Sequence, residues 1–180
     1  MAPELDPLIA NLARTQSIFL RAADAVAAEE WNTRPSQERW SAAELVVHLM
    51  MVERAVIEKA DRVTQKLPRR IGLLKRIHIP MMLVELRVIR RKSPIPLAPE
   101  LLRAKEEMLA ELREVRGRSR AFLEETRDRD LRDYCWKHPA LGTLNTYEWM
   151  RFISAHEVRH TKQMREIAAS LPKVIERLQK

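Results

Sequence analysis

The spacing of proline is the feature that most restricts how this 180-residue chain can fold. Proline lacks a backbone N–H and its ring clashes with the preceding turn, so helix interiors exclude it. The ten prolines leave four long proline-free stretches, at residues 8–34, 36–67, 100–138 and 140–171. The chain also has only three glycines, too few for the tight turns of a sandwich or a barrel. Helices are therefore favoured, and an all-β fold is nearly excluded.

Each stretch carries apolar residues three and four positions apart, which is the period of one helix face. The second stretch opens at Ser41 and Glu44, which match a capping box, and the fourth opens similarly at Asn145. No alternating strand pattern of useful length is present, and residues 130–145 are predicted to form a loop. We predict an all-α fold, a single four-helix bundle over residues 1–180. The predicted core positions include Leu8, Leu12, Phe19, Met108, Leu112, Phe122, Phe152, Ile153 and Ile167.

The net charge of +8 is concentrated in one segment. Between Lys66 and Lys92, nine basic residues stand against one acidic residue, while the rest of the chain is balanced. The long connection between the second and third helices should hold an extra helical arm, within a basic insert at 66–97. Its basic and apolar residues interleave as in interfacial helices, but it lacks aromatic residues for stacking nucleic-acid bases. We expect a contact with a homodimer partner, an anionic membrane surface as the less favoured choice, and no nucleic acid.

The cysteine content and the N-terminal region indicate the compartment. A single cysteine, Cys135, excludes an intramolecular disulfide framework and a cysteine-rich zinc module. The first residues are acidic where a signal peptide would be basic. The longest apolar window, residues 77–86, spans about 10 residues, whereas a membrane-spanning helix needs about 20. The sequence therefore predicts a cytoplasmic protein.

Two of the five histidines form an H-E-x-x-H pattern at residues 156–160, on a predicted helix. Residues four apart leave a helix about 40° apart, so the imidazoles of His156 and His160 can reach one metal ion. Zinc proteases with this pattern need a third ligand downstream, and the residues after His160 lack the glycine and histidine of the extended motif. A di-iron site needs a second Glu-x-x-His, but Glu44 and His48 have the wrong spacing. Both of these classes are disfavoured.

The upstream candidate for a third ligand is His48, in the middle of the second stretch. An isolated histidine on an apolar helix face is also commonly a core residue held by one hydrogen bond. Three imidazoles without partners would be costly to bury in one small core, and a bound cation would remove that cost. Three neutral nitrogens with an open fourth position form a catalytic type of metal site, not a closed structural one.

Three segments of the chain resemble the DinB/YfiT-like superfamily. They are the W-S-x-x-E-x-x-x-H-L pattern at residues 40–49, the H-P-A-L-G segment at 138–142, and H-E-V-R-H-T-K-Q at 156–163. The resemblance extends from about residue 11 to 169, apart from the insert at 67–97. It implies a four-helix bundle of the DinB-like type.

The resemblance also implies a metal centre. In the family a histidine of the second helix joins an H-x-x-x-H pair on the fourth, and these roles fall on His48, His156 and His160. Nitrogen ligands suit one divalent ion of Zn, Ni, Co or Fe. Some members are thiol S-transferases that use bacillithiol, mycothiol or similar low-molecular-weight thiols, so we expect a small-molecule substrate and a metal-dependent transferase or hydrolase. The alternative is a non-catalytic binding module whose basic insert, 66–92, contacts a dimer partner or an anionic surface.

Three further residues have two interpretations each. Glu157, about 100° away from the histidine stripe, could act as a catalytic general base, or could pair with a neighbour such as Arg159. His138, which precedes Pro139, either approaches the open side of the metal site or belongs to a surface turn. Cys135 is either a substrate-contacting thiol or a packing residue.

Overall fold

The computed structural model describes residues 5–68, 84 and 103–178, with side chains as far as Leu171. Four long helices account for most of these residues: α1 (Leu5–Asp24), α2 (Ala42–Thr64), α4 (Lys105–Glu125) and α5 (Thr146–Leu178). A short antiparallel hairpin, β1 (Cys135–His138) and β2 (Gly142–Asn145), connects α4 to α5. The predicted all-α fold class is thus confirmed, with a small hairpin added.

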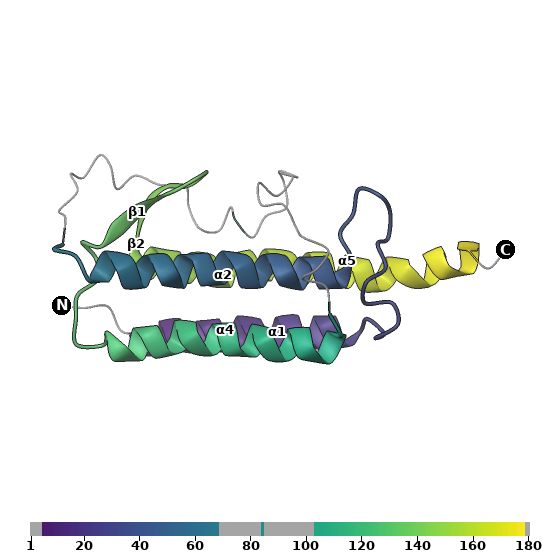
Figure 1. The fold of residues 1–180 in the computed structure, drawn as a ribbon, viewed down its shortest axis with the longest axis horizontal. Coiled ribbons are helices and arrows are strands. Elements are labelled where there is room, and N and C mark those ends of the chain that lie inside the picture. The colour runs from purple at the N-terminus through teal and green to yellow at the C-terminus, as the bar shows by residue number, and fades with distance from the viewer. Residues whose placement is uncertain (1–4, 69–83, 85–102, 179–180) are drawn as a thin grey trace.

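The four helices pack as the corners of a square (Figure 1). α1 contacts α4 and α5, and α2 contacts the same two helices. α1 and α5 run in one direction while α2 and α4 run in the other, so α2 ends at one end of the bundle and α4 begins at the opposite end. The connection between them must return over the length of a bundle of about 34 Å, the rise of a 23-residue helix. This geometry explains why the chain needs a long segment there.

The predicted helical arm at 66–97 lies almost entirely outside the described residues. Within it the structure describes only residues 66–68 and Val84, which has helical backbone conformation and packs against the apolar core. The expected contacts of the arm with a dimer partner or an anionic surface therefore stay predictions.

The start of α2 is fixed by side-chain hydrogen bonds, as its sequence predicted. The Ser41 hydroxyl accepts a hydrogen bond from the Glu44 backbone N–H at 3.2 Å, and the Glu44 carboxylate accepts one from the Ser41 N–H at 2.8 Å. Arg34 pairs with the same carboxylate through its guanidinium group. These bonds satisfy backbone donors that the first helical turn leaves without partners.

The start of α5 is capped in the same way. The Asn145 side chain accepts a hydrogen bond from the Glu148 backbone N–H at 3.0 Å, and the Glu148 carboxylate accepts one from the Asn145 N–H at 2.7 Å. The helix then continues through Pro172 as far as Leu178. The proline-free stretch therefore underestimates the length of α5, because a proline removes one backbone hydrogen bond and the helix resumes beyond it.

The hairpin corrects the loop predicted at residues 130–145. Cys135 pairs with Asn145 and His138 pairs with Gly142, across a turn in which Gly142 has a φ of 102°. Glycine adopts that angle without a steric penalty. Strands of four residues are too short to show a period of two in the sequence, so the alternation test could not detect them.

Buried apolar residues form two clusters, one toward each end of the bundle. One contains Phe19, Trp31, Leu112 and Ile167, and the other contains Leu8, Ile57, Phe122 and Ile153. Along each helix the two clusters are separated by buried polar side chains, which we call the polar layer: Thr15, Glu53, Arg116, Ser119 and Glu157. The core positions predicted from helical periodicity are buried. The polar layer was not predicted.

None of the described helices has the character of a membrane-spanning helix. Such a helix needs about 20 predominantly apolar residues. Among residues 5–68, 84 and 103–178, no helix has both the length and the apolar character required.

Removing the α2 cap should destabilise the protein measurably. We expect Ser41→Ala to lower the free energy of unfolding by about 1 kcal/mol, because the Glu44 backbone N–H loses its acceptor. Ser170→Ala is the control, since Ser170 lies inside α5, where its hydroxyl donates to Glu166 and Ile167 carbonyls and caps no helix. Urea denaturation of both variants checks this, and equal effects would contradict the capping role.

Candidate metal centre

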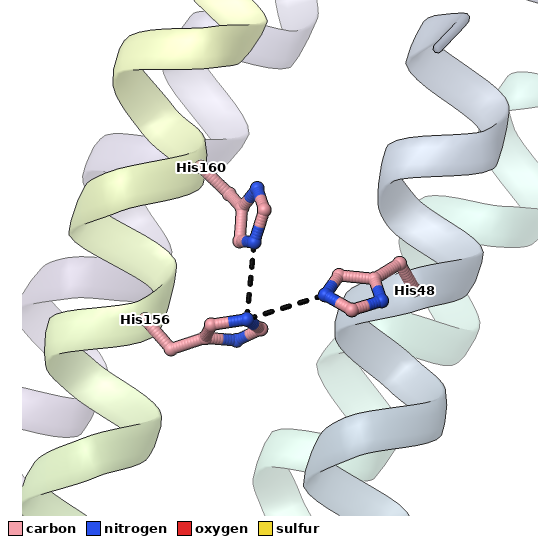
Figure 2. Close-up of side chains that lie close together, drawn as sticks. All are labelled: His48, His156 and His160. Atoms are coloured by element: carbon pink, nitrogen blue, oxygen red, sulfur yellow. Dashed lines mark hydrogen bonds between the residues drawn. The ribbon is translucent and has the colours of Figure 1, made fainter. Parts of the chain in front are cut away.

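Three histidines from two helices converge at one point between α2 and α5 (Figure 2). The Nε2 atom of His156 lies 3.2 Å from Nε2 of His48 and 3.0 Å from Nε2 of His160. The three ligand nitrogens all lie within 4.8 Å of one another. His48 and His160 are buried and His156 is partly buried. The structure thus brings together the three predicted ligands.

A neighbouring glutamine sets the tautomer of His160. Its Nδ1 lies 3.1 Å from Oε1 of Gln163, one turn along α5. In this orientation the amide oxygen accepts, which favours the tautomer with the proton on Nδ1 and a lone pair on Nε2 directed to the centre. Metal-binding histidines commonly have their second nitrogen held in this way.

The geometry of the cluster fits a metal ion. A single proton on His156 Nε2 can serve one of its two close nitrogen contacts, not both. A cation at the centre would satisfy all three lone pairs. With metal–nitrogen bonds of about 2.0–2.1 Å, two ligand nitrogens lie about 2.9 Å apart at a right angle and about 3.3 Å apart at a tetrahedral angle. The observed 3.0 and 3.2 Å fall between these values.

Burial keeps these imidazoles in the form that binds metals. It lowers the pKa of His48 to about 4. The pKa of His156 lies well below the usual value, because of burial first and then the neighbouring His160 and His48. Both rings are consequently neutral near pH 7, and a metal ion need not displace protons from them.

Aromatic side chains flank the three histidines. The Trp40 ring lies 4.9 Å from the His48 ring and 6.4 Å from the His160 ring, between centroids. On the other side, Phe152 stacks on His156 at 5.2 Å. These contacts limit ring rotation and place apolar surface beside the centre.

His138 is close to the site but is not one of the converging ligands. Its Nδ1 accepts hydrogen bonds from the backbone N–H groups of Ala140 and Leu141, at 3.0 and 3.1 Å, which closes the hairpin turn. Its ring packs on Trp149 and on Phe152, the residue that stacks on His156. His138 is therefore one aromatic ring away from the metal centre.

Cys135 belongs to the same hairpin, and its thiol lies 3.3 Å from the Arg132 carbonyl oxygen. It is not among the three residues grouped as candidate ligands in the described part of the chain. A role for Cys135 or His138 toward a substrate stays a prediction.

Glu157 faces the interior of the bundle. It is 1% exposed, and its Oε2 accepts a hydrogen bond from Arg116 Nη1 at 3.1 Å. Arg116 also donates to both oxygens of Glu53, at 2.7 and 3.1 Å. Burial raises the pKa of Glu157, and the charge of Arg116 opposes that rise. The partner of Glu157 is therefore Arg116 of α4, and a role as general base stays a prediction.

The residues that hold Glu157 were missed by sequence reasoning. Arg116 follows Leu112 by four positions and Glu53 follows Leu49 by four, so both occupy the apolar face of a helix. A charged residue at a core-facing position is rarely buried unless it is paired. A charged residue on the apolar face of a helix was therefore the sequence feature that could have revealed these residues. Two such residues of opposite charge on different helices predict a buried ion pair.

The chain is similar to a known protein family and to a bacterial protein. A sequence model described as the DinB superfamily matches residues 11–164. The uncharacterized protein YuaE of Bacillus subtilis (strain 168) is 29% identical over 141 residues, which cover 77% of this chain and 83% of YuaE. No solved structure matches the chain significantly.

The three-histidine site predicts a specific loss on mutation. We expect His48→Ala to lower affinity for zinc or nickel at least about 100-fold, because two ligands from one helix remain where three had converged. Helix content should be retained, since the two apolar clusters are unchanged. Chelator-competition titration and circular dichroism measure both effects, and unchanged affinity would show that the third ligand is another residue.

The partial burial of His138 predicts a pH dependence of stability. Burial lowers its pKa to about 4, below the unfolded value of about 6.5. The unfolded chain therefore binds more protons between these values, and His138 makes the free energy of unfolding fall as pH drops from about 6.5 to about 4. The ring is half-exposed, so we expect a loss on the order of 1 kcal/mol.

His138→Asn is the matching variant, because an asparagine oxygen can accept the same turn N–H without titrating. Denaturation of metal-free wild type and variant at pH 7 and pH 4.5 should show the variant losing less stability on acidification. Parallel losses in the two proteins would contradict the assignment.

Proposed function

We propose, from the premise that this chain belongs to the DinB superfamily, that it is a mononuclear divalent-metal protein and a metal-dependent enzyme. The observation that carries the proposal is the convergence of three imidazole Nε2 atoms, 3.0 and 3.2 Å apart along two edges. Their nitrogen chemistry suits Zn, Ni, Co or Fe. The proposed ligands are His48, His156 and His160.

A bound ion with an open coordination position lowers the pKa of a thiol or water that binds to it, which supplies a nucleophile near neutral pH. The residues of the chain orient the site for this purpose. Gln163 holds the Nδ1 proton of His160, and Trp40 and Phe152 restrict the histidine rings from two sides. The aromatic surfaces beside the centre favour an apolar or flat electrophile as co-substrate.

The position of Glu157 favours thiol transfer over hydrolysis. A hydrolase commonly needs a general base within hydrogen-bond reach of the attacking water. The Glu157 carboxylate is buried and paired with Arg116. Transfer to a low-molecular-weight thiol has less need of such a base, because a free thiol is already far more acidic than water and can lose its proton to solvent as it binds. We therefore rank a thiol S-transferase first and a hydrolase second.

A second candidate function rests on the charge of the chain. Nine basic residues and one acidic residue between Lys66 and Lys92 could contact a dimer partner or an anionic surface, which would make the protein a binding module. This possibility does not compete with metal binding at the histidines. It becomes the preferred function if fully metal-loaded protein shows no turnover.

A thiol screen tests the enzyme proposal. The metal-loaded protein is mixed with low-molecular-weight thiols and an aryl halide such as chlorodinitrobenzene, whose carbon–chlorine bond breaks as a carbon–sulfur bond forms. We expect turnover that a chelator abolishes and that rises with pH, since the thiol must lose its proton to bind. The His156→Ala variant is the control for a metal-independent background reaction. Absence of turnover with thiols and with hydrolysable esters would contradict the enzyme proposal.

A further inference from the structure

A small cavity lies between the metal centre and the polar layer. Its volume is about 10 Å³, close to the minimum that one water molecule needs. It is lined by His156, Glu157, Glu53 and Arg116, together with aliphatic side chains that include Val52. It therefore touches one proposed ligand and the whole buried ion network.

One carboxylate oxygen beside this cavity has no hydrogen-bond partner among the described residues. Oε2 of Glu157 accepts from Arg116, but Oε1 is buried and accepts from no group. The Thr15 hydroxyl lies near this carboxylate, where its hydrogen bonding helps to lower the pKa of Glu157, and it also lies 3.3 Å from the Leu12 carbonyl oxygen. A buried carboxylate oxygen left in this state is strongly unfavourable, so a donor is expected there.

His156 needs a hydrogen-bond acceptor for its Nδ1 atom. Its Nε2 faces the other two histidines, whereas Nδ1, one ring carbon away, is directed away from them (Figure 2). A histidine that binds a metal through Nε2 carries its proton on Nδ1 and needs an acceptor for it. His156 and Glu157 are adjacent on α5 and line the same cavity, although their side chains leave the helix in different directions.

We propose that one buried water molecule in this cavity accepts a hydrogen bond from Nδ1 of His156 and donates one to Oε1 of Glu157. Glu157 is then a positioning residue for His156, held in turn by Arg116 and Glu53. This inference rests on the proposed metal site. The polar layer then orients the proposed ligand His156 through a water-mediated contact.

Charge complementarity gives the arrangement a second benefit. With both carboxylates ionised, Glu53 and Glu157 place two negative charges against the single positive charge of Arg116, which gives the ion network a net charge of −1. Three neutral imidazoles add no charge, whereas a divalent ion on them adds +2. In a buried environment of low dielectric constant, the net negative layer favours the cation next to it.

Two variants of the full-length protein test the bridge by different means. Glu157→Gln removes the negative charge and weakens the acceptor, and Val52→Ile fills the cavity while every polar group is kept. We expect both to weaken zinc and cobalt binding about 10- to 100-fold in chelator competition, the usual effect of losing such a partner. Val56→Ile is the matched control, since it adds the same methylene group one turn along α2, away from the cavity.

Two further measurements do not depend on the metal. A crystal structure of the metal-free protein should show a water within hydrogen-bond distance of His156 Nδ1 and Glu157 Oε1. Nitrogen-15 NMR should show His156 as the Nδ1–H tautomer in wild type and a mixture of tautomers in Val52→Ile. The tautomer readout would not change if Glu157 were merely structural.

The outcomes separate this inference from the proposed function. A dry cavity, or a Val52→Ile protein that matches wild type in both affinity and tautomer, overturns the bridge even if the metal site is real. A wild-type protein that contains the water and the Nδ1–H tautomer but binds no metal refutes the proposed function and supports the bridge. Equal losses in Val52→Ile and Val56→Ile assign the effect to overpacking and overturn the bridge.

Discussion

The buried guanidinium of Arg116 is the contact on which the arrangement of the bundle depends. It binds Glu53 of α2 and Glu157 of α5, and it also donates to the Leu12 carbonyl of α1. One side chain of α4 thus joins all four helices. Removing one partner of such a buried ion pair typically costs about 3–5 kcal/mol, because a charge is left without compensation. Other rotations or shifts of the helices would break these bonds, so the polar layer selects one register.

That register also assembles the candidate metal site. His156 directly precedes Glu157 on α5, and His48 lies five residues before Glu53 on α2. When both carboxylates reach the same guanidinium, the two helix segments that carry the histidines are brought face to face, and the Nε2 atoms of His48 and His156 come within 3.2 Å. The ion network and the histidine site therefore depend on the same helix register, and an apolar cluster lies on each side of the polar layer.

The hairpin adds a wall of aromatic rings to one side of this centre. Trp136 of β1 stacks on Trp149 at 5.0 Å, Trp149 meets Phe152 at 5.5 Å, and Phe152 stacks on His156 at 5.2 Å. The rings form a continuous path from the surface hairpin to a proposed ligand.

The sequence alone determined the helices and the candidate ligand pair within one helix, because the patterns that predict them are local. The four helices were predicted from proline spacing, helical periodicity and the caps at Ser41 and Asn145. The four-residue spacing of His156 and His160 placed both rings on one helix face. Only the tertiary structure decided that these rings converge with His48. It also decided the pairing of Arg116 with two carboxylates and the direction of α4. Each of these depends on how helices distant in sequence are rotated and shifted against one another, which no local pattern encodes.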